Sequence, residues 1–236
     1  MLGLNYKLEK LEKNGTPILV GIVGAGQMGQ GMVSQMHLMV GMNPSIVADI
    51  NIENAKKAFI NAGIPEDKIK YTKCVDESDE WIGQGNYVVT EDAKVITESK
   101  KIQVLIEATG VTEVGAKIAL DTIMGKKHLV MLNAETDVVI GPLLKKLADN
   151  AGIVYTGAAG DEPAATKELF DFAKAEGFDV RVIGKGKNNK IDKDCNPDTV
   201  LEEATRRGVN PHMLASFKEG SKTMVELAVM SNATGY

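Results

Sequence analysis

A glycine-spaced segment, Gly24–Gly29, is the first place where this sequence could bind a ligand. An apolar run short enough for a buried strand, Ile18–Val23, leads into it, and a segment with helical apolar spacing, Gln30–Val40, follows. In that order the first glycine allows a tight turn, the second lets the backbone approach a pyrophosphate, and the third lets the helix pack on the strand. The helix N-terminus would also face the phosphate charge. The spacing therefore predicts a dinucleotide-binding loop.

An acidic residue stands close to where such a loop needs one. Ser45–Ala48 is typical of a second strand, and Asp49 follows it at close to the ~20 residues expected for an acid that binds the adenosine ribose. A carboxylate there repels a 2′-phosphate, and no arginine follows nearby to receive one. The pattern favours NAD(H) over NADP(H), while Lys56 and Lys57 keep NADP(H) open.

Three polar segments end later apolar runs: Glu107–Gly110, Asn133–Asp137 and Gly157–Pro163. The first falls where the nicotinamide half of a cofactor crosses the strand ends, and its glutamate needs a partner because burying an unpaired charge is costly. In the third, Asp161 and Glu162 cap a helix, bind substrate hydroxyls or hold a divalent cation through oxygen. No residue is assigned to a metal. The expected cofactor-binding residues are Gly24, Gly26, Gln27, Met28, Gly29, Asp49, Ala108, Thr109, Gly110 and Asn133.

Lysines in the last part of the chain suggest an anionic substrate. The segment Gly184–Lys190 offers three lysines and two asparagines, which suits a phosphate or carboxylate, although a solvated loop has the same composition. Lys222 stands at a helix start, against the usual dipole preference, and could transfer a proton to the oxygen at the reacting carbon. We expect Lys222 and Lys187 to be catalytic, with Asp161 and Glu162 orienting the substrate.

The elements that position these residues alternate in type. This alternation predicts an α/β fold, a Rossmann-type doubly wound and mostly parallel sheet followed by part of a second, substrate-binding domain. We expect a cofactor domain over residues 1–157 and a truncated catalytic domain over 158–236. The expected strands are 18–23, 45–48, 87–90, 104–108, 128–132, 153–155 and 179–183. The expected helices are 7–13, 30–40, 54–62, 92–96, 114–124, 142–150, 163–177 and one from 222, with 64–85 as an insertion or irregular helix.

The composition and charge of the chain argue against several classes of protein. The chain has 236 residues, 44% hydrophobic and 25% charged, with a net charge of −5 and no long basic run, which argues against nucleic acid or an anionic membrane as partner. Cys74 and Cys195 form no metal-type pair, no apolar run approaches ~18 residues, and no signal peptide is recognised, so we expect a cytoplasmic protein. The apolar last helix predicts an apolar surface that either residues past Tyr236 or a partner subunit would cover, and we expect a homo-oligomer.

Four of these segments together resemble the homoserine-dehydrogenase-like oxidoreductases: Gly21–Gly29, Leu105–Gly110, Gly125–Glu135 and Gly160–Ala164. Two more, 184–189 and 222–235, resemble the branch with a C-terminal SAF domain, which includes the deoxyxylulose-phosphate reductoisomerase-like enzymes. The resemblance implies that Asp161, Glu162, Lys187, Lys222 and Glu226 border the substrate and that a SAF domain follows. The sequence departs from homoserine dehydrogenases at Glu135, where those enzymes usually carry lysine, which argues against homoserine.

These observations predict an NAD(P)-dependent oxidoreductase. A hydride would pass to or from a small polar, anionic substrate, and the branch resemblance implies a reductoisomerase-like step on a sugar phosphate or sugar acid. The alternatives are a homoserine-type hydroxy amino acid dehydrogenase and a non-catalytic redox sensor that binds NAD(H). A sensor has no need of the lysine-asparagine loop or of Lys222, so their presence favours an enzyme.

Overall fold

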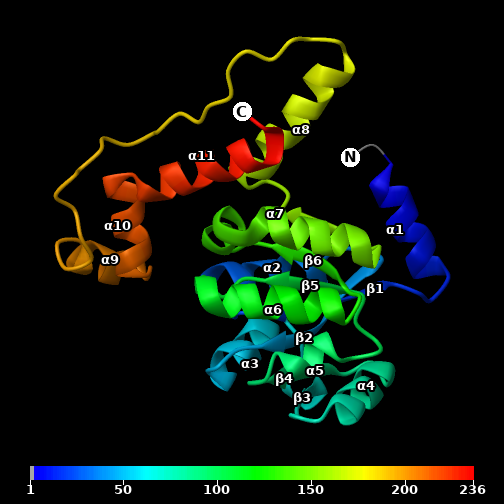
Figure 1. Ribbon diagram of the computed structural model, residues 1–236. Helices are drawn as coiled ribbons and strands as arrows, with labels where there is room; N and C mark the ends of the chain where they lie inside the picture. The colour runs from blue at the N-terminus through cyan, green and yellow to red at the C-terminus, as the bar shows by residue number, and fades with distance from the viewer. Residues whose placement is uncertain (1–2) are drawn as a thin grey trace. The chain divides into compact units, whose positions relative to one another are not determined.

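The computed structural model describes residues 3–236 (Figure 1). It divides into two compact units, Met1–Thr136 with Leu143–Thr156 and Asp137–Pro142 with Gly157–Tyr236. Among the described residues, no helix combines the length and apolar character that crossing a membrane requires.

The first unit is built on a seven-stranded sheet in the order β3-β4-β2-β1-β5-β6-β7. The strands are β1 (Ile18–Val23), β2 (Met42–Ala48), β3 (Ile69–Tyr71), β4 (Tyr87–Thr90), β5 (Val104–Glu107), β6 (His128–Met131) and β7 (Tyr155–Gly157). Pairing is parallel from β3 through to β6. The expected Rossmann-type α/β fold is confirmed. Because β2 lies on one side of β1 and β5 on the other, the strand order reverses at β1, and ligands bind at such a reversal.

Helices connect the strands of this unit and follow them into the second. They are α1 (Leu4–Lys13), α2 (Gln27–His37), α3 (Ile52–Asn61), α4 (Val75–Gly83), α5 (Lys94–Thr97), α6 (Thr112–Met124), α7 (Ala134–Ala151), α8 (Glu162–Ala175), α9 (Leu201–Arg207), α10 (Pro211–Glu219) and α11 (Ser221–Thr234), with a 3₁₀ turn η1 (Glu66–Lys68).

The core beside the glycine loop explains why the first strand and helix form where the sequence predicts them. Val20 and Ile22 on β1 are almost completely buried, and they belong to one apolar cluster with Val33 of α2 and Phe59 of α3. Full burial of an aliphatic or aromatic side chain contributes about 1.5–3 kcal/mol. The strand and the two helices are therefore held against each other with the loop at their junction.

Residues 64–85 differ from the prediction of an insertion or irregular helix. They form η1, the edge strand β3 and α4. The strand is only three residues long, half-exposed, and pairs with β4 alone. Too few apolar residues alternate there to make the strand visible in the sequence.

The predicted start of the helix over 142–150 is wrong. The structure shows α7 beginning at Ala134, with Asn133 as its N-cap and Pro142 inside it. A proline within a helix leaves the carbonyl four residues earlier without its usual donor. Here that carbonyl belongs to Val138, and the side-chain amide of Asn232 donates to it at 3.1 Å. A partner from a distant helix thus compensates for the proline.

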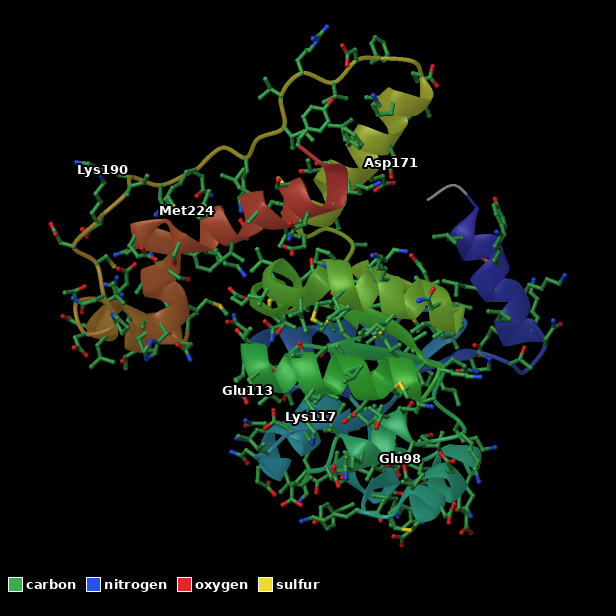
Figure 2. All side chains as sticks on the ribbon, viewed as in Figure 1. Glu98, Glu113, Lys117, Asp171, Lys190 and Met224 are labelled. Carbon is green, nitrogen blue, oxygen red and sulfur yellow. The ribbon has the colours of Figure 1, made fainter. Side chains whose placement is uncertain are left out.

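The second unit is helical in its regular structure. Its α8 packs on α11, and α9 with α10 encloses a small core that includes Val200, Ala204 and Leu214. The strand predicted over 179–183 is absent from the described residues; instead Tyr236 Oη donates to the carbonyl of Val180 at 2.6 Å. Lys190 lies in the long connecting segment and Met224 on α11 (Figure 2).

Candidate functional site

The glycine loop has the geometry of a phosphate-binding turn. Gly24 has a φ of 100°, and a Cβ on it would lie 2.5 Å from the carbonyl oxygen of Ala108. A Cβ on Gly29 would lie 2.0 Å from the carbonyl oxygen of Gly24. Gly26, the N-cap of α2, is different because a Cβ there would meet nothing within 4 Å. Two glycines allow close packing and the third keeps open the space in front of the helix, which fits the requirements of a dinucleotide pyrophosphate.

The first helical turn, with Gln27 and Met28, begins directly at this open space. Asp49 also holds the glycine loop in place, through a hydrogen bond to the loop backbone. Its Oδ2 accepts from the backbone N–H of Ala25 at 2.6 Å, and its Oδ1 accepts from that of Asn51 at 2.8 Å. The carboxylate after β2 is thus placed beside the glycine loop, where an acid can meet ribose hydroxyls.

The segment Ala108–Gly110, which follows β5, adjoins the same loop. The backbone N–H of Ala108 donates to the carbonyl of Val23 at 2.8 Å, and the contact with Gly24 adds a second link. The loops after β1 and β5 therefore meet at the point where the strand order reverses.

Glu107, the last residue of β5, is completely buried. Its Oε1 accepts from the backbone N–H of Thr109 at 2.9 Å and also from the Thr109 hydroxyl. Burial raises the pKa of Glu107, while the Thr109 hydrogen bonds and the nearby Asn133 amide oppose the rise. Asn133 is buried too, and its Oδ1 accepts from the N–H of Thr136 at 3.2 Å as the cap of α7.

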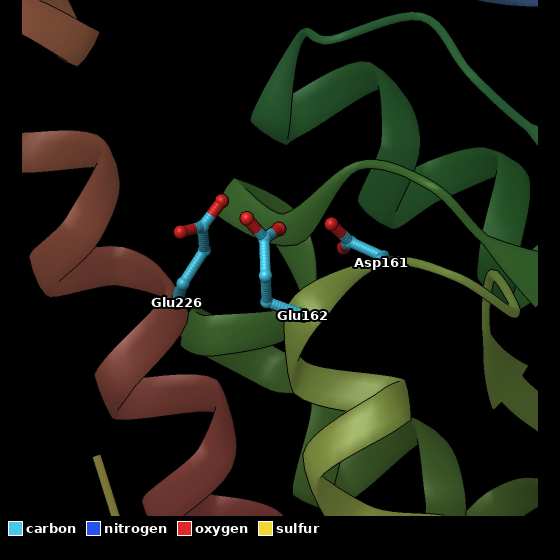
Figure 3. Close-up of side chains that lie close together, drawn as sticks. All are labelled: Asp161, Glu162 and Glu226. Atoms are coloured by element: carbon cyan, nitrogen blue, oxygen red, sulfur yellow. The ribbon is translucent and has the colours of Figure 1, made fainter. Parts of the chain in front are cut away.

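Three carboxylates come together in the second unit (Figure 3). Asp161 is the N-cap of α8, Glu162 begins that helix, and Glu226 lies on α11. One carboxylate oxygen from each of them lies within 4.8 Å of those from the other two. The side chain of Asp161 makes no capping hydrogen bond, so its carboxylate is not used by the helix backbone. We call these three residues the carboxylate cluster.

Lys185 supplies the counter-charge. Its Nζ forms ion pairs with Glu162 at 2.9 Å and with Glu226, whose side chain is only 3% exposed. Burial alone would lower the pKa of Lys185, but the hydrogen bonds to both glutamates raise it overall. The same bond to Lys185 lowers the pKa of Glu162. Burial, followed by the neighbouring Glu162 and Glu226, raises the pKa of Asp161.

The two lysines expected to be catalytic lie differently. Lys222 is near enough to Asp161 for its charge to oppose the rise in the Asp161 pKa. Lys187 donates instead to the backbone carbonyl of Phe217. The sequence presents Lys185 only as one of three lysine donors in the segment Gly184–Lys190. The alternating glycines of that segment do not indicate which lysine reaches the carboxylates. The four-residue spacing of Lys222 and Glu226, by contrast, places both on one face of a helix.

The carboxylate cluster has the chemistry of a site for polar groups. Its oxygens can accept from hydroxyls or from an ammonium group, and carboxylates within this range also suit a hard divalent cation. The ammonium of Lys185 already neutralises part of this charge. Burial raises the pKa of Asp161, so this carboxyl group holds a proton more tightly than an exposed aspartate does.

Residues 160–236 match the model of a protein family described as oxidoreductase DRL, catalytic domain. The match supports the resemblance of this part of the chain to an oxidoreductase. A comparison with curated proteins found no match.

Solved structures of several proteins are similar to part of this chain. Myo-inositol dehydrogenase from Lactobacillus casei, solved with NAD(H) and myo-inositol, is 17% identical with a TM-score of 0.45, covering 66% of this chain and 42% of that one. An NAD-binding oxidoreductase from Klebsiella pneumoniae is 14% identical with a TM-score of 0.46, covering 68% and 39%. GenD2 from gentamicin A biosynthesis, solved with NAD, is 15% identical with a TM-score of 0.43, covering 67% and 40%. The chain therefore spans between 39% and 42% of the length of these proteins.

Proposed function

We propose that this protein is an NAD(P)-dependent oxidoreductase that prefers NAD(H) and acts on a small, polar, anionic substrate. The observation that carries the proposal is the glycine loop, where Gly26 keeps open the space at the start of α2 while Asp49 is fixed beside it. In this proposal residues 1–157 bind the cofactor and residues 158–236 the substrate. The match of residues 160–236 to an oxidoreductase catalytic domain supports the second assignment.

The bound cofactor would supply the hydride acceptor or donor. The residues of the chain would bind and orient the cofactor and the substrate. Gly24, Gly26 and Gly29 form the cradle, and Gln27 and Met28 begin the helix whose N-terminus faces the pyrophosphate. Asp49 would accept the ribose hydroxyls. Ala108, Thr109, Gly110 and Asn133 would border the nicotinamide end, at the carboxyl ends of the central strands.

In the second unit we assign Lys222 to proton transfer at the substrate oxygen, since it lies near Asp161. Lys187 would bind the anionic part of the substrate, and Asp161 with Glu162 would orient its hydroxyls. A sugar phosphate or sugar acid fits this combination of carboxylates and lysines, and the resemblance of residues 184–189 and 222–235 to the reductoisomerase-like branch implies a step of that kind. The family match supports an oxidoreductase. A divalent cation is not needed for these roles.

One observation favours a second candidate, a hydroxy amino acid dehydrogenase. The carboxylate cluster already binds an ammonium group, that of Lys185. The ammonium of an amino acid substrate could take the same place, because its charge and hydrogen-bonding capacity are the same.

A titration followed by a turnover assay separates these functions. NADH and NADPH are titrated by fluorescence into the purified protein, with Gly26→Val as the variant and Gly31→Val as the control, since Gly31 is also on α2 with nothing within 4 Å of its Cβ position. Cofactor oxidation is then followed on sugar phosphates, sugar acids and hydroxy amino acids. Binding without turnover would indicate a sensor, and no binding would reject the proposal.

A further inference from the structure

A completely buried carboxyl group stands at the edge of the sheet where the proposed cofactor binds. Glu107 ends β5 and has no exposed surface. Burying a charged group without compensation is expensive. Apolar residues occupy the rest of β5, so an aliphatic side chain would satisfy packing at this position more cheaply. We therefore expect Glu107 to have a role other than packing in the core.

The carboxylate connects two loops that belong to different crossovers. Through Oε1 it accepts both the N–H and the hydroxyl of Thr109, in the loop after β5. Its Oε2 faces the region of Asn133, at the start of α7. A Cβ placed on Gly115 of α6 would lie 2.9 Å from this Oε2 and 2.7 Å from Nδ2 of Asn133. Gly115 thus leaves room for the two polar groups to approach each other.

The hydrogen-bonding capacity of these groups is complementary. Within residues 3–236, Glu107 Oε2 and Asn133 Nδ2 are two of the three buried side-chain atoms without a well-formed hydrogen bond, and one is an acceptor while the other is a donor. Asn133 cannot reverse its amide without cost, because Oδ1 accepts from Thr136 as the helix cap. The amide therefore keeps its N–H groups directed toward Oε2 of Glu107, an acceptor that lacks a donor.

We propose that Glu107 is a positioning residue for the nicotinamide end of the cofactor, setting the distance between the loop at Ala108–Gly110 and the start of α7 at Asn133. This inference rests on the proposed function. A shift of Glu107 would therefore displace the loop after β5 and the start of α7. The position of Asp49 and the open space at Gly26 would stay unchanged.

An amide cannot replace the carboxylate in this role. In Glu107→Gln the carbonyl oxygen can still accept from Thr109, but the NH₂ group then faces the NH₂ group of Asn133. Two donors would oppose each other in a buried place, where an unsatisfied group costs about 1–3 kcal/mol. Changing Asn133→Asp as well restores the match, since the amide of residue 107 can donate to the new carboxylate and aspartate is also a good N-cap.

The test compares binding of NADH with binding of ADP, which lacks the nicotinamide end. Glu107→Gln is expected to weaken NADH binding about tenfold, equivalent to 1.4 kcal/mol, and ADP binding less than twofold. The double variant with Asn133→Asp is expected to recover most of the NADH affinity. The control is Glu113→Gln, the same change at an exposed residue of α6 (Figure 2). Circular dichroism and the Tm of each variant establish that it folds.

Unchanged NADH affinity in Glu107→Gln, a parallel loss of NADH and ADP, or no recovery in the double variant overturns the inference. If Glu107→Gln does not fold, Gly115→Ala provides the second measurement, because its Cβ would press on both polar groups, with Gly83→Ala in α4 as the helical control. The same selective loss of NADH is then expected, and equal losses contradict it. Absence of NADH binding in the unaltered protein would instead refute the proposed function.

Discussion

Replacing Lys185 with methionine is expected to destabilise the second unit. Methionine keeps most of the length of the lysine side chain and removes its charge. Glu226, 3% exposed in its side chain, then loses its ion-pair partner inside the protein. Removing one member of a buried ion pair costs about 3–5 kcal/mol. Because the Lys185 side chain keeps 15% exposure, we place the loss near the lower end, at about 3 kcal/mol. The pair with Glu162, which is 53% exposed, adds no more than about 1 kcal/mol.

Urea unfolding followed by circular dichroism measures this loss. The matched control is Lys190→Met, because Lys190 is an exposed lysine of the same segment. The double variant Lys185→Met with Glu226→Gln removes the uncompensated charge and is expected to recover more than half of the lost stability, since an amide is cheaper to bury than a carboxylate.

The reasoning is refuted if Lys185→Met unfolds at the urea concentration of the Lys190→Met control. It is also refuted if the double variant is less stable than Lys185→Met by itself. In either case the ammonium group would not be what compensates Glu226.

Five further outcomes are expected. Gly26→Val abolishes NADH binding in a folded protein, as a fluorescence titration shows, because its side chain fills the space for the pyrophosphate. Asp49→Ala weakens NADH more than NADPH in titrations with both, since the ribose hydroxyls lose their acceptor. With a substrate identified, Lys222→Ala lowers kcat by roughly 10²–10⁴-fold at unchanged NADH affinity, whereas Lys187→Ala mainly raises KM because an anion anchor binds ground and transition states alike. Asp161→Asn gains stability relative to the unaltered protein between pH 4 and pH 7 in urea unfolding: a raised pKa means that the folded state holds the proton more tightly, so stability is lost as the pH rises through that pKa.

Four of these, those on Gly26, Asp49, Lys222 and Asp161, are contradicted by the following results. Normal NADH affinity in folded Gly26→Val means that the glycine loop is not a nucleotide site. Tighter binding of NADPH than of NADH by the unaltered protein rejects the role of Asp49. Near-normal kcat in Lys222→Ala rejects its assignment, and an equal stability difference at both pH values rejects the effect of burial on Asp161.

The first half of the fold could be predicted because its signals are local. The glycine spacing, the apolar strand before it and Asp49 after the next strand are contained in one short stretch, and the structure brings Asp49 to the backbone of Ala25. Each residue there is positioned by its neighbours in sequence and by one core.

Other features depend on residues far away in the chain. Pro142 is typical of a helix start, yet it lies within α7 because Asn232 supplies a donor to the carbonyl of Val138. The apolar alternation near Val180 is typical of a strand, but no strand pairs with it within residues 3–236. The carbonyl of Val180 instead accepts a hydrogen bond from the Tyr236 hydroxyl. The role of Lys185 likewise depends on Glu226, 41 residues away.

Two buried glutamates, one in each unit, are compensated in different ways, and this difference bears on function. Glu107 is held by Thr109 through a backbone N–H and a hydroxyl at the end of a strand, so its donors cannot leave without disturbing the sheet edge. Glu226 is held by the side chain of Lys185, which comes from the stretch 178–200, where the structure has neither helix nor strand. A flexible ammonium on an irregular segment can be replaced by another cation at the cost of rearranging one side chain. We therefore expect the proposed cofactor site to be rigid before binding and the proposed substrate site to adjust as the substrate binds.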